Sequence, residues 1–339
     1  MALRDLRALP KAHLHLHLEG AMRPSTLAEL CARNGTPQPD PPDGSFPTFI
    51  RLYRTAAAAL RSPDDYARLV REVVEDAAAD GVVWLEVAEW IMPDLPARLG
   101  LPSAEAHLEV LLDSARRAAR DSGVGVGLMI STNRTHDPAE AVTLARLAAR
   151  YAGRGVVAFG LADDETRGRP APFAEAFAIA RAAGLISAPH AGEHGGPDSV
   201  REALDALGAR RIQHGVRSIE DPALVQRLAA EGVCLDVCPT SNSQLGVVPA
   251  LADHPLPQLL AAGVSISLNA DDPLFFGAGV LAEYTLARDV LGLDAAALAH
   301  VAACSLRASG APDSLRGPAL AGIARWLLDS DDASVAGNR

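Results

Sequence analysis

The sequence predicts an α/β chain folded as a (β/α)8 TIM barrel, and two observations support this fold class. Eight short apolar runs alternate with segments of helical hydrophobic spacing, which is the element count of this barrel. Polar and histidine-containing segments directly follow several of these runs, and such barrels keep their chemistry at the C-terminal ends of the strands. The predicted strands cover residues 13–18, 82–89, 124–131, 156–162, 186–191, 211–214, 233–238 and 264–269.

Local signals separate the predicted helices from these strands. Helices are expected to begin after Ser62, Ser103 and Asp137, because each of these capping residues is followed by proline, aspartate or glutamate. Glycines that can end a helix stand directly before five of the predicted strands, at Gly81, Gly123, Gly184, Gly232 and Gly263. The chain is therefore divided regularly into helix and strand.

The first connection is longer than a barrel requires. Residues 35–44 are rich in proline and glycine, and helical patterns flank them, so the sequence predicts an insertion after the first strand. Phe49, Leu52 and Tyr53 follow at helical spacing. Two interpretations stand for this segment, an apolar lid over the barrel mouth or ordinary packing.

The remaining length fits one domain. We expect a single barrel domain over residues 1–328, with extra helices after the last strand, and a flexible tail over 329–339. Four scattered cysteines do not form a disulfide framework, so we expect buried free thiols. The sequence leaves the oligomeric state open.

Composition excludes several function classes. The net charge of −11 disfavours nucleic-acid binding, which needs a basic surface. No stretch of about 18 uncharged apolar residues occurs and the N-terminus has no apolar leader, so we expect a cytoplasmic protein that binds a small molecule rather than a membrane.

The segment from His13 to Glu19 is the most informative part of the chain. His13, His15 and His17 alternate with leucine, so they share one strand face, and the two later histidines lie nearer the expected barrel mouth. His190 and Asp271 follow distant strands and can join them. Three imidazoles and one carboxylate suit Zn²⁺ better than Mg²⁺, although iron or manganese can use the same ligands. We therefore predict one zinc ion per chain.

Several further motifs occur in a fixed order. They read His190-Ala191-Gly192-Glu193, then Gln213-His214-Gly215, then Ser267-Leu268-Asn269-Ala270-Asp271-Asp272-Pro273. Together with the first histidine segment, this set resembles the adenosine deaminase family of metal-dependent amidohydrolases, over about Leu9 to Phe276. The resemblance implies a barrel with one metal ion that hydrolyses a 6-aminopurine to the 6-oxo product plus ammonia.

The resemblance also implies a role for each matching residue. Glu193 stands where the family's glutamate protonates purine N1 during attack at C6. His214 matches the histidine that orients or deprotonates the attacking water. Asp271 matches a metal ligand, and Asp272 matches the residue that holds purine N7. His13 stands where the family commonly has glutamate, so we expect it to pack behind the site.

Two departures concern the substrate. Glu19 replaces the aspartate that reaches the ribose in adenosine deaminases, and glutamate also occurs at this position in adenine deaminases. Asp163 replaces a glycine that approaches purine N3. We expect a purine nucleoside, either adenosine or a 5′-modified adenosine such as 6-aminodeoxyfutalosine. The alternatives are adenine itself and a barrel that binds nucleosides without turnover.

Two other deaminase or hydrolase classes fit less well. Two-metal hydrolases of the same superfamily use a carboxylated lysine, whereas the single lysine here, Lys11, precedes the first strand. A bridging carboxylate from Asp163, Asp164 or Glu165 stays open. The nucleic-acid deaminases need H-x-E with P-C-x-x-C, which Cys238-Pro239-Thr240 does not supply.

Overall fold

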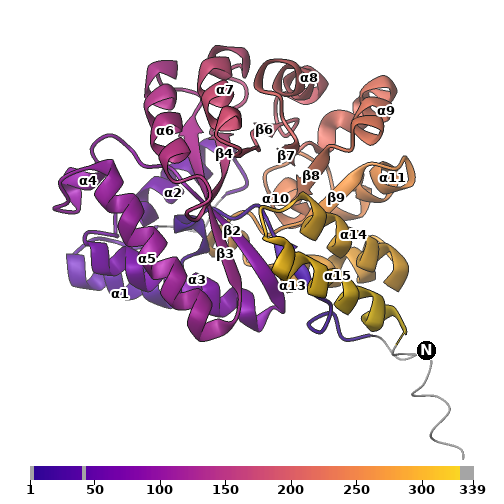
Figure 1. Ribbon diagram of the computed structural model, residues 1–339, viewed down its shortest axis with the longest axis horizontal. Coiled ribbons are helices and arrows are strands. Elements are labelled where there is room, and N and C mark those ends of the chain that lie inside the picture. The colour runs from indigo at the N-terminus through magenta and orange to yellow at the C-terminus, as the bar shows by residue number, and fades with distance from the viewer. Residues whose placement is uncertain (1–3, 40–42, 329–339) are drawn as a thin grey trace, which may run out of the picture.

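The computed structural model describes residues 4–39 and 43–328 as an α/β fold whose parallel strands curl into a half-barrel (Figure 1). The predicted tail at 329–339 lies outside the described residues. Five strands form one parallel sheet in the order β1 (Lys11–His13), β2 (Val82–Glu89), β3 (Gly125–Asn133), β4 (Val156–Ala162) and β5 (Ile186–Ser187). Four strands form the second parallel sheet in the order β6 (His190–Ala191), β7 (Arg211–His214), β8 (Cys234–Val237) and β9 (Ser265–Leu268).

The predicted strand at 186–191 is wrong in one respect, because it divides into β5 and β6 at Ala188 and Pro189. Proline has no N–H to donate to a neighbouring strand, so the ladder is interrupted there. The backbone nevertheless stays hydrogen-bonded to the neighbouring strands β4 and β7. The amide of Ala188 donates to the carbonyl of Phe159, and the carbonyl of Pro189 accepts from the amide of Gln213.

The predicted strand at 13–18 is also wrong in its bounds. The assigned strand ends at His13, and the following residues pair through isolated bridges, Leu16 with Asp271 and His17 with Ala88. The physical reason is a side chain that replaces the ladder. Asn269 Oδ1 accepts from the backbone amides of Leu14 and His15 at 2.7 and 3.1 Å. This contact fastens the first strand's continuation to the end of β9.

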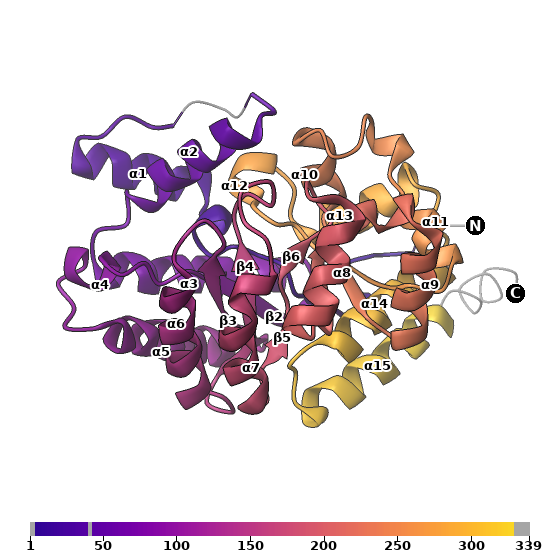
Figure 2. The same ribbon diagram turned by 90° about the horizontal axis from the view of Figure 1, so that it is seen from above.

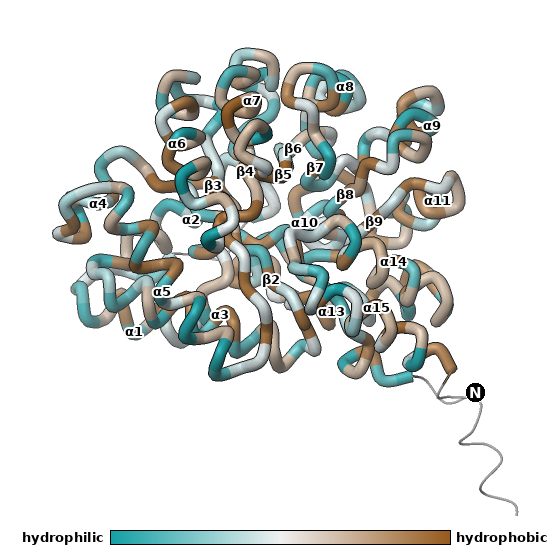
Figure 3. Tube along the Cα trace, viewed as in Figure 1, coloured by the Kyte–Doolittle hydropathy of each residue, from teal (hydrophilic) through white to brown (hydrophobic). Residues whose placement is uncertain are grey.

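Helices follow most strands and cover the outside of the sheets (Figures 1 and 2). Those between β2 and β9 are α4 (Leu95–Arg98), α5 (Ala104–Ser122), α6 (Pro138–Arg150), α7 (Ala174–Ala182), α8 (Gly196–Leu207), α9 (Pro222–Glu231), α10 (Pro239–Gln244) and α11 (Leu256–Ala261). The caps that the sequence predicts are present: Ser62, Ser103 and Asp137 each accept a backbone amide of the first turn. The tube in Figure 3 alternates hydrophobic and hydrophilic residues along these helices, as one-sided packing requires.

The insertion and the C-terminal additions are both present. Three helices lie between β1 and β2, namely α1 (Pro24–Asn34), α2 (Phe46–Ala57) and α3 (Pro63–Ala79). Four follow β9, namely α12 (Pro273–Phe276), α13 (Val280–Asp289), α14 (Ala295–Ala308) and α15 (Asp313–Leu328). Figure 2 shows α1 and α2 projecting beyond the other helices, with α12 beside α2. In the part of the chain that the structure describes, no helix has the length and apolar character needed to cross a membrane.

Candidate metal and active site

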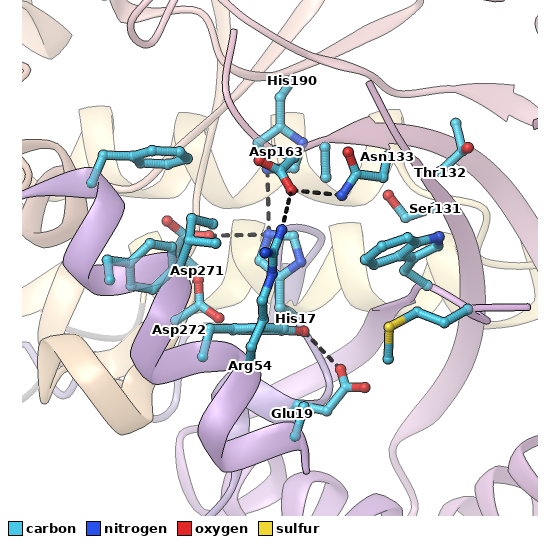
Figure 4. A pocket seen from close by; sticks show the side chains of 18 of the residues that line it. His17, Glu19, Arg54, Ser131, Thr132, Asn133, Asp163, His190, Asp271 and Asp272 are labelled. Carbon is cyan, nitrogen blue, oxygen red and sulfur yellow. Dashed lines mark hydrogen bonds and ion pairs between the residues drawn. The ribbon is translucent and has the colours of Figure 1, made fainter. Parts of the chain in front are cut away.

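The histidines and the aspartate predicted as metal ligands meet at one end of the strands. Nε2 of His15 lies 3.1 Å from Asp271 Oδ1, and Nε2 of His17 lies 3.3 Å from the same oxygen. Nε2 of His17 is also 3.3 Å from Nε2 of His190 (Figure 4). The C-terminal ends of distant strands thus bring the four predicted side chains together.

Backbone carbonyls fix the direction of two of these imidazoles. Nδ1 of His15 lies 3.2 Å from the carbonyl of Asp236, and Nδ1 of His190 lies 3.0 Å from the carbonyl of Leu161. A carbonyl only accepts, so each Nδ1 carries the proton and each Nε2 offers a lone pair to the cluster. Nε2 of His15 is buried without a hydrogen-bond partner. A divalent cation satisfies these lone pairs, so the donor set fits a metal.

A fourth histidine lies close enough to compete for the same role. His15, His190, His214 and Asp271 offer ligand atoms within 4.8 Å of one another, and His17, Asp271 and Asp272 form an overlapping group. His13 lies outside both groups, as expected. Its Nε2 accepts the backbone amide of Ala270, directly before Asp271.

Asp271 is held by a residue whose role the sequence did not reveal. The hydroxyl of Ser241 donates to Asp271 Oδ2 at 2.6 Å, which leaves Oδ1 facing His15 and His17. The backbone of Asp271 pairs in both directions with the first strand's continuation, since its amide donates to the carbonyl of His15 and its carbonyl accepts from the amide of His17. Ser241 directly follows Cys238-Pro239-Thr240, and the sequence around it does not indicate that it contacts Asp271.

Backbone strain is concentrated at this site. Among the described residues, the non-glycine residues with positive φ are Asp163 at 77°, His214 at 63° and Asp271 at 60°. Such conformations cost on the order of 1 to 3 kcal/mol each and persist where surrounding structure enforces them. Asp163 therefore keeps a glycine-like backbone at the position where the resembling family has glycine.

Glu193 is buried beside the cluster. Its Oε1 lies 3.6 Å from Nε2 of His214, and burial together with the charge of Asp271 raises the pKa of Glu193 well above its usual range. The loop that carries Glu193 is held by Glu165, whose Oε2 accepts the amides of Glu193 and Gly195. The site therefore places beside His214 a buried carboxyl that holds its proton more tightly than an exposed glutamate does.

Asp272 is a second buried acid, and a glycine makes room for it. A Cβ placed on Gly20 would lie 1.7 Å from Asp272 Oδ1, so the turn after Glu19 accepts no larger residue. Asp272 Oδ1 has no hydrogen-bond partner among the described residues. Burial and the neighbouring Asp271 raise the pKa of Asp272 well above its usual range. Asp272 therefore presents to the pocket a buried carboxyl that holds its proton more tightly than an exposed aspartate does.

Glu19 is not free to turn. Its two oxygens accept hydrogen bonds from the hydroxyls of Tyr53, at 2.7 Å, and Tyr66, at 3.2 Å. Burial and the nearby Glu89 raise the pKa of Glu19 to about 7. The extra methylene of glutamate relative to aspartate lets the carboxyl reach Tyr53 on α2 (Figure 4).

Asp163 also connects the strand ends to α2. Its Oδ2 accepts from Asn133 Nδ2 at 2.6 Å and lies 3.4 Å from Arg54 Nη2 (Figure 4). Sequence reasoning did not identify Arg54, because a single arginine on an amphipathic helix is ordinary. Its position one residue after Tyr53 was the available signal.

These side chains line a cavity of about 310 Å³. Phe49 and Tyr53 line it, and Phe49 packs against Leu245 and Phe276 in a small apolar cluster. Leu52 is buried but does not line the cavity, so the three residues of the predicted lid divide between two environments. The cavity is lined also by Phe46, Ile50, Trp90, Met92, Arg98, Ser131 and Thr132.

The features of a lysine-bridged two-metal site are absent from the described residues. Nζ of Lys11 donates to the carbonyl of Asp80 at 2.9 Å, outside the cluster. Asp164 accepts the backbone amide of Thr166 in its own loop, and Glu165 accepts the amides of Glu193 and Gly195 in the loop after β6. Neither carboxylate belongs to the groups that can hold an ion.

Imidazole and carboxylate donors at the ends of parallel strands, with a buried carboxyl beside them, define a metal-dependent hydrolase. Residues 10–326 match the sequence profile described as adenosine deaminase. The chain therefore belongs to the adenosine deaminase family. A Streptomyces coelicolor protein named adenosine/adenine deaminase is 46% identical over 96% of this chain and 99% of its own length. Further relatives named adenine deaminase are 36–39% identical.

Solved structures agree in fold. Adenine deaminase from Arthrobacter aurescens is 34% identical, with a TM-score of 0.86 over 94% of this chain and 99% of that chain. An amidohydrolase from Burkholderia ambifaria with bound zinc is 29% identical, with a TM-score of 0.86 over 97% of this chain and 94% of that one. The strands of this chain therefore match those of the TIM-barrel amidohydrolases.

Proposed function

We propose that this chain hydrolytically deaminates a 6-aminopurine nucleoside, adenosine or a 5′-modified adenosine such as 6-aminodeoxyfutalosine, with one zinc ion per chain. One observation carries this proposal: two buried carboxyls, Glu193 and Asp272, lie beside the metal cluster. A purine offers two acceptors, N1 and N7, on either side of the C6 amine. Glu193 can donate to N1 and Asp272 to N7, because the pKa of each is raised by burial.

The ligands that we propose for the ion are His15, His17, His190 and Asp271. When bound, a zinc ion supplies a water of lowered pKa as the nucleophile. The protein's own residues orient the purine and supply a proton. Glu193 protonates N1 as the C6 carbon becomes tetrahedral, and Asp272 holds the ring edge-on, so the amine faces the cluster. Water adds to C6 and ammonia leaves, which gives the 6-oxo product.

A nucleoside is supported by the lining of the cavity. Besides the carboxyls that would hold the base, Glu19, Asp163, Trp90, Met92 and Arg98 line the same space of about 310 Å³. These additional residues offer contacts to a sugar and a 5′ group. Binding energy from such remote groups raises the rate at the reacting carbon.

Adenine is the second candidate, and a specific contact favours it. The hydroxyls of Tyr53 and Tyr66 already occupy both oxygens of Glu19, so this carboxyl is less available to a ribose. Several relatives are named adenine deaminase.

A panel of adenine, adenosine, deoxyadenosine and 5′-modified adenosines tests the proposal. We expect kcat/KM for one of the nucleosides to exceed that for adenine, and we expect Glu19→Asp to shift preference toward plain adenosine by about 1–3 kcal/mol. A larger kcat/KM for adenine than for every nucleoside would select the second candidate. Binding of nucleosides without ammonia release would indicate a barrel that has lost turnover.

We also infer that β1–β9 complete a (β/α)8 barrel around the site. Two joins support this closure. The Leu16–Asp271 bridge connects the two sheets on one side, and β5 continues into β6 on the other.

A further inference from the structure

His214 is held from behind by a chain of two buried polar side chains. Its Nδ1 lies 3.1 Å from Nδ2 of Asn242, and Oδ1 of Asn242 lies 3.2 Å from Nε2 of His254. The three side chains are at most 1% exposed. None of the roles assigned so far uses Asn242 or His254.

A backbone amide, which can only donate, sets the direction of the first hydrogen bond in this series. The backbone amide of Leu256 donates to Nδ1 of His254 at 3.1 Å. That nitrogen therefore has a lone pair and no proton. Burial lowers the pKa of His254 to about 4, so the ring is neutral near pH 7 and its proton resides on Nε2.

The proton on Nε2 of His254 determines the donor and the acceptor in each remaining hydrogen bond of the series. Because Nε2 of His254 carries a proton, it donates to Oδ1 of Asn242. The amide of Asn242 is thereby oriented with its NH₂ group toward His214, and that group donates to Nδ1 of His214. Nδ1 of His214 is an acceptor, so a neutral His214 carries its proton on Nε2.

Nε2 of His214 faces the reaction site. It lies 3.6 Å from Glu193 Oε1 and 3.9 Å from Asp271 Oδ2. A protonated Nε2 has no lone pair for a metal, so His214 is excluded from the ligand set and His17 stays in it. The same proton points at the space where an oxygen would add to the purine.

We propose that Asn242 and His254 are positioning residues that hold His214 as the Nε2–H tautomer. His214 then acts as a hydrogen-bond donor to the attacking oxygen and to the charge that develops on it, rather than as a base or a metal ligand. This inference rests on the proposed function for its catalytic consequence. The tautomer itself does not depend on the substrate.

The direct test is nitrogen NMR of zinc-loaded protein labelled with ¹⁵N-histidine near pH 7. The His214 signals are identified by their loss in His214→Gln. We expect the chemical shift of a protonated nitrogen at Nε2 and that of an unprotonated nitrogen at Nδ1. The opposite tautomer, a doubly protonated ring or a metal-bound Nε2 would each overturn the proposal. This readout needs no turnover, so failure of the substrate panel would leave it intact.

Asn242→Asp provides the sharpest variant. The introduced carboxylate accepts from both rings, so it favours a proton on Nδ1 of His214. We expect the tautomer signals to reverse and kcat to fall at least about 10²-fold, with folding followed by thermal unfolding. Unchanged tautomer signals in a folded Asn242→Asp protein would overturn the proposal.

His254 provides a second, matched pair of variants. His254→Gln retains a donor near the position of Nε2, whereas His254→Leu does not. We expect His254→Gln to keep the His214 tautomer and most of kcat, and His254→Leu to give mixed tautomers and at least about a 10-fold lower kcat. Equal tautomer populations in the two variants would show that His254 acts through packing alone.

Discussion

The metal end and the mouth of the same cavity are built differently. At the metal end, His15 and His190 are held by backbone carbonyls of neighbouring strands and are buried. At the mouth, the link between α2 and the strand ends includes Arg54, whose side chain is 60% exposed, at 3.4 Å from Asp163. The metal end is thus held by the strands, whereas the mouth includes a contact from a helix of the insertion.

This difference has an energetic meaning. Hydrogen bonds to backbone carbonyls of a sheet cannot be lost without disturbing the strands themselves. An ion pair with one exposed partner contributes about 0–1 kcal/mol. Substitutions at the metal end should therefore affect the reaction strongly, and substitutions at the mouth should adjust substrate preference.

Removal of the ion should have the largest effect. Chelation is expected to abolish deamination, and stoichiometric Zn²⁺ should restore it, because the cluster holds the reaction's nucleophile. Metal analysis should give about one ion per chain. Two tightly bound ions per chain, or full activity in metal-free protein, would contradict a mononuclear site.

Glu193→Gln should have the next largest effect. The amide keeps the volume of the side chain but carries no acidic proton, so kcat should fall at least about 10²-fold while zinc content is unchanged. Glu175→Gln, on the exposed surface of α7, is the matched control and should leave kcat unaltered. A kcat for Glu193→Gln within a few-fold of the wild type would remove this residue from the mechanism.

Glu89 is a further buried acid, and it lies close to Glu19. Burial raises the pKa of Glu89 from 4.5 to about 8, and its Oε1 is 2.9 Å from Nε2 of His107. Since the folded state holds the proton more tightly than the unfolded state does, this group's contribution is fully present below pH 4.5. It is lost as pH rises toward 8.

We therefore expect the wild type to lose about 3 kcal/mol more unfolding free energy than Glu89→Gln between pH 5 and pH 8. Denaturant titrations at the two pH values measure this difference. Glu175→Gln again serves as the control and should follow the wild type. Parallel losses in Glu89→Gln and the wild type would show that Glu89 is ionised in the folded protein.

Arg54→Ala should have the smallest effect. Loss of its pair with Asp163 loosens the mouth, so KM for nucleosides should change by no more than about 5-fold, with kcat nearly constant. Arg51→Ala, three residues earlier on α2 and not in the cavity lining, is the matched control. A drop in kcat as large as that of Glu193→Gln would mean that the mouth takes part in the chemical step.

The sequence by itself determined the chemistry of this protein. Histidines at alternating positions, HAGE, and adjacent aspartates before proline are short local patterns, and their place after apolar runs puts them at strand ends. Capping residues and glycines likewise marked several element boundaries. These features are encoded within a few residues of chain, so they can be identified without knowing what lies opposite.

Tertiary structure alone decided which side chains support that chemistry. Arg54 meets Asp163 across 109 positions, and Tyr53 meets Glu19 across 34. The strand limit at His13 also depended on the distant Asn269. His254 reaches His214 through Asn242, and the tautomer that we propose for His214 is inferred from those contacts. Hydrogen bonds and ion pairs of this kind depend on distance in space, and packing of whole elements sets that distance.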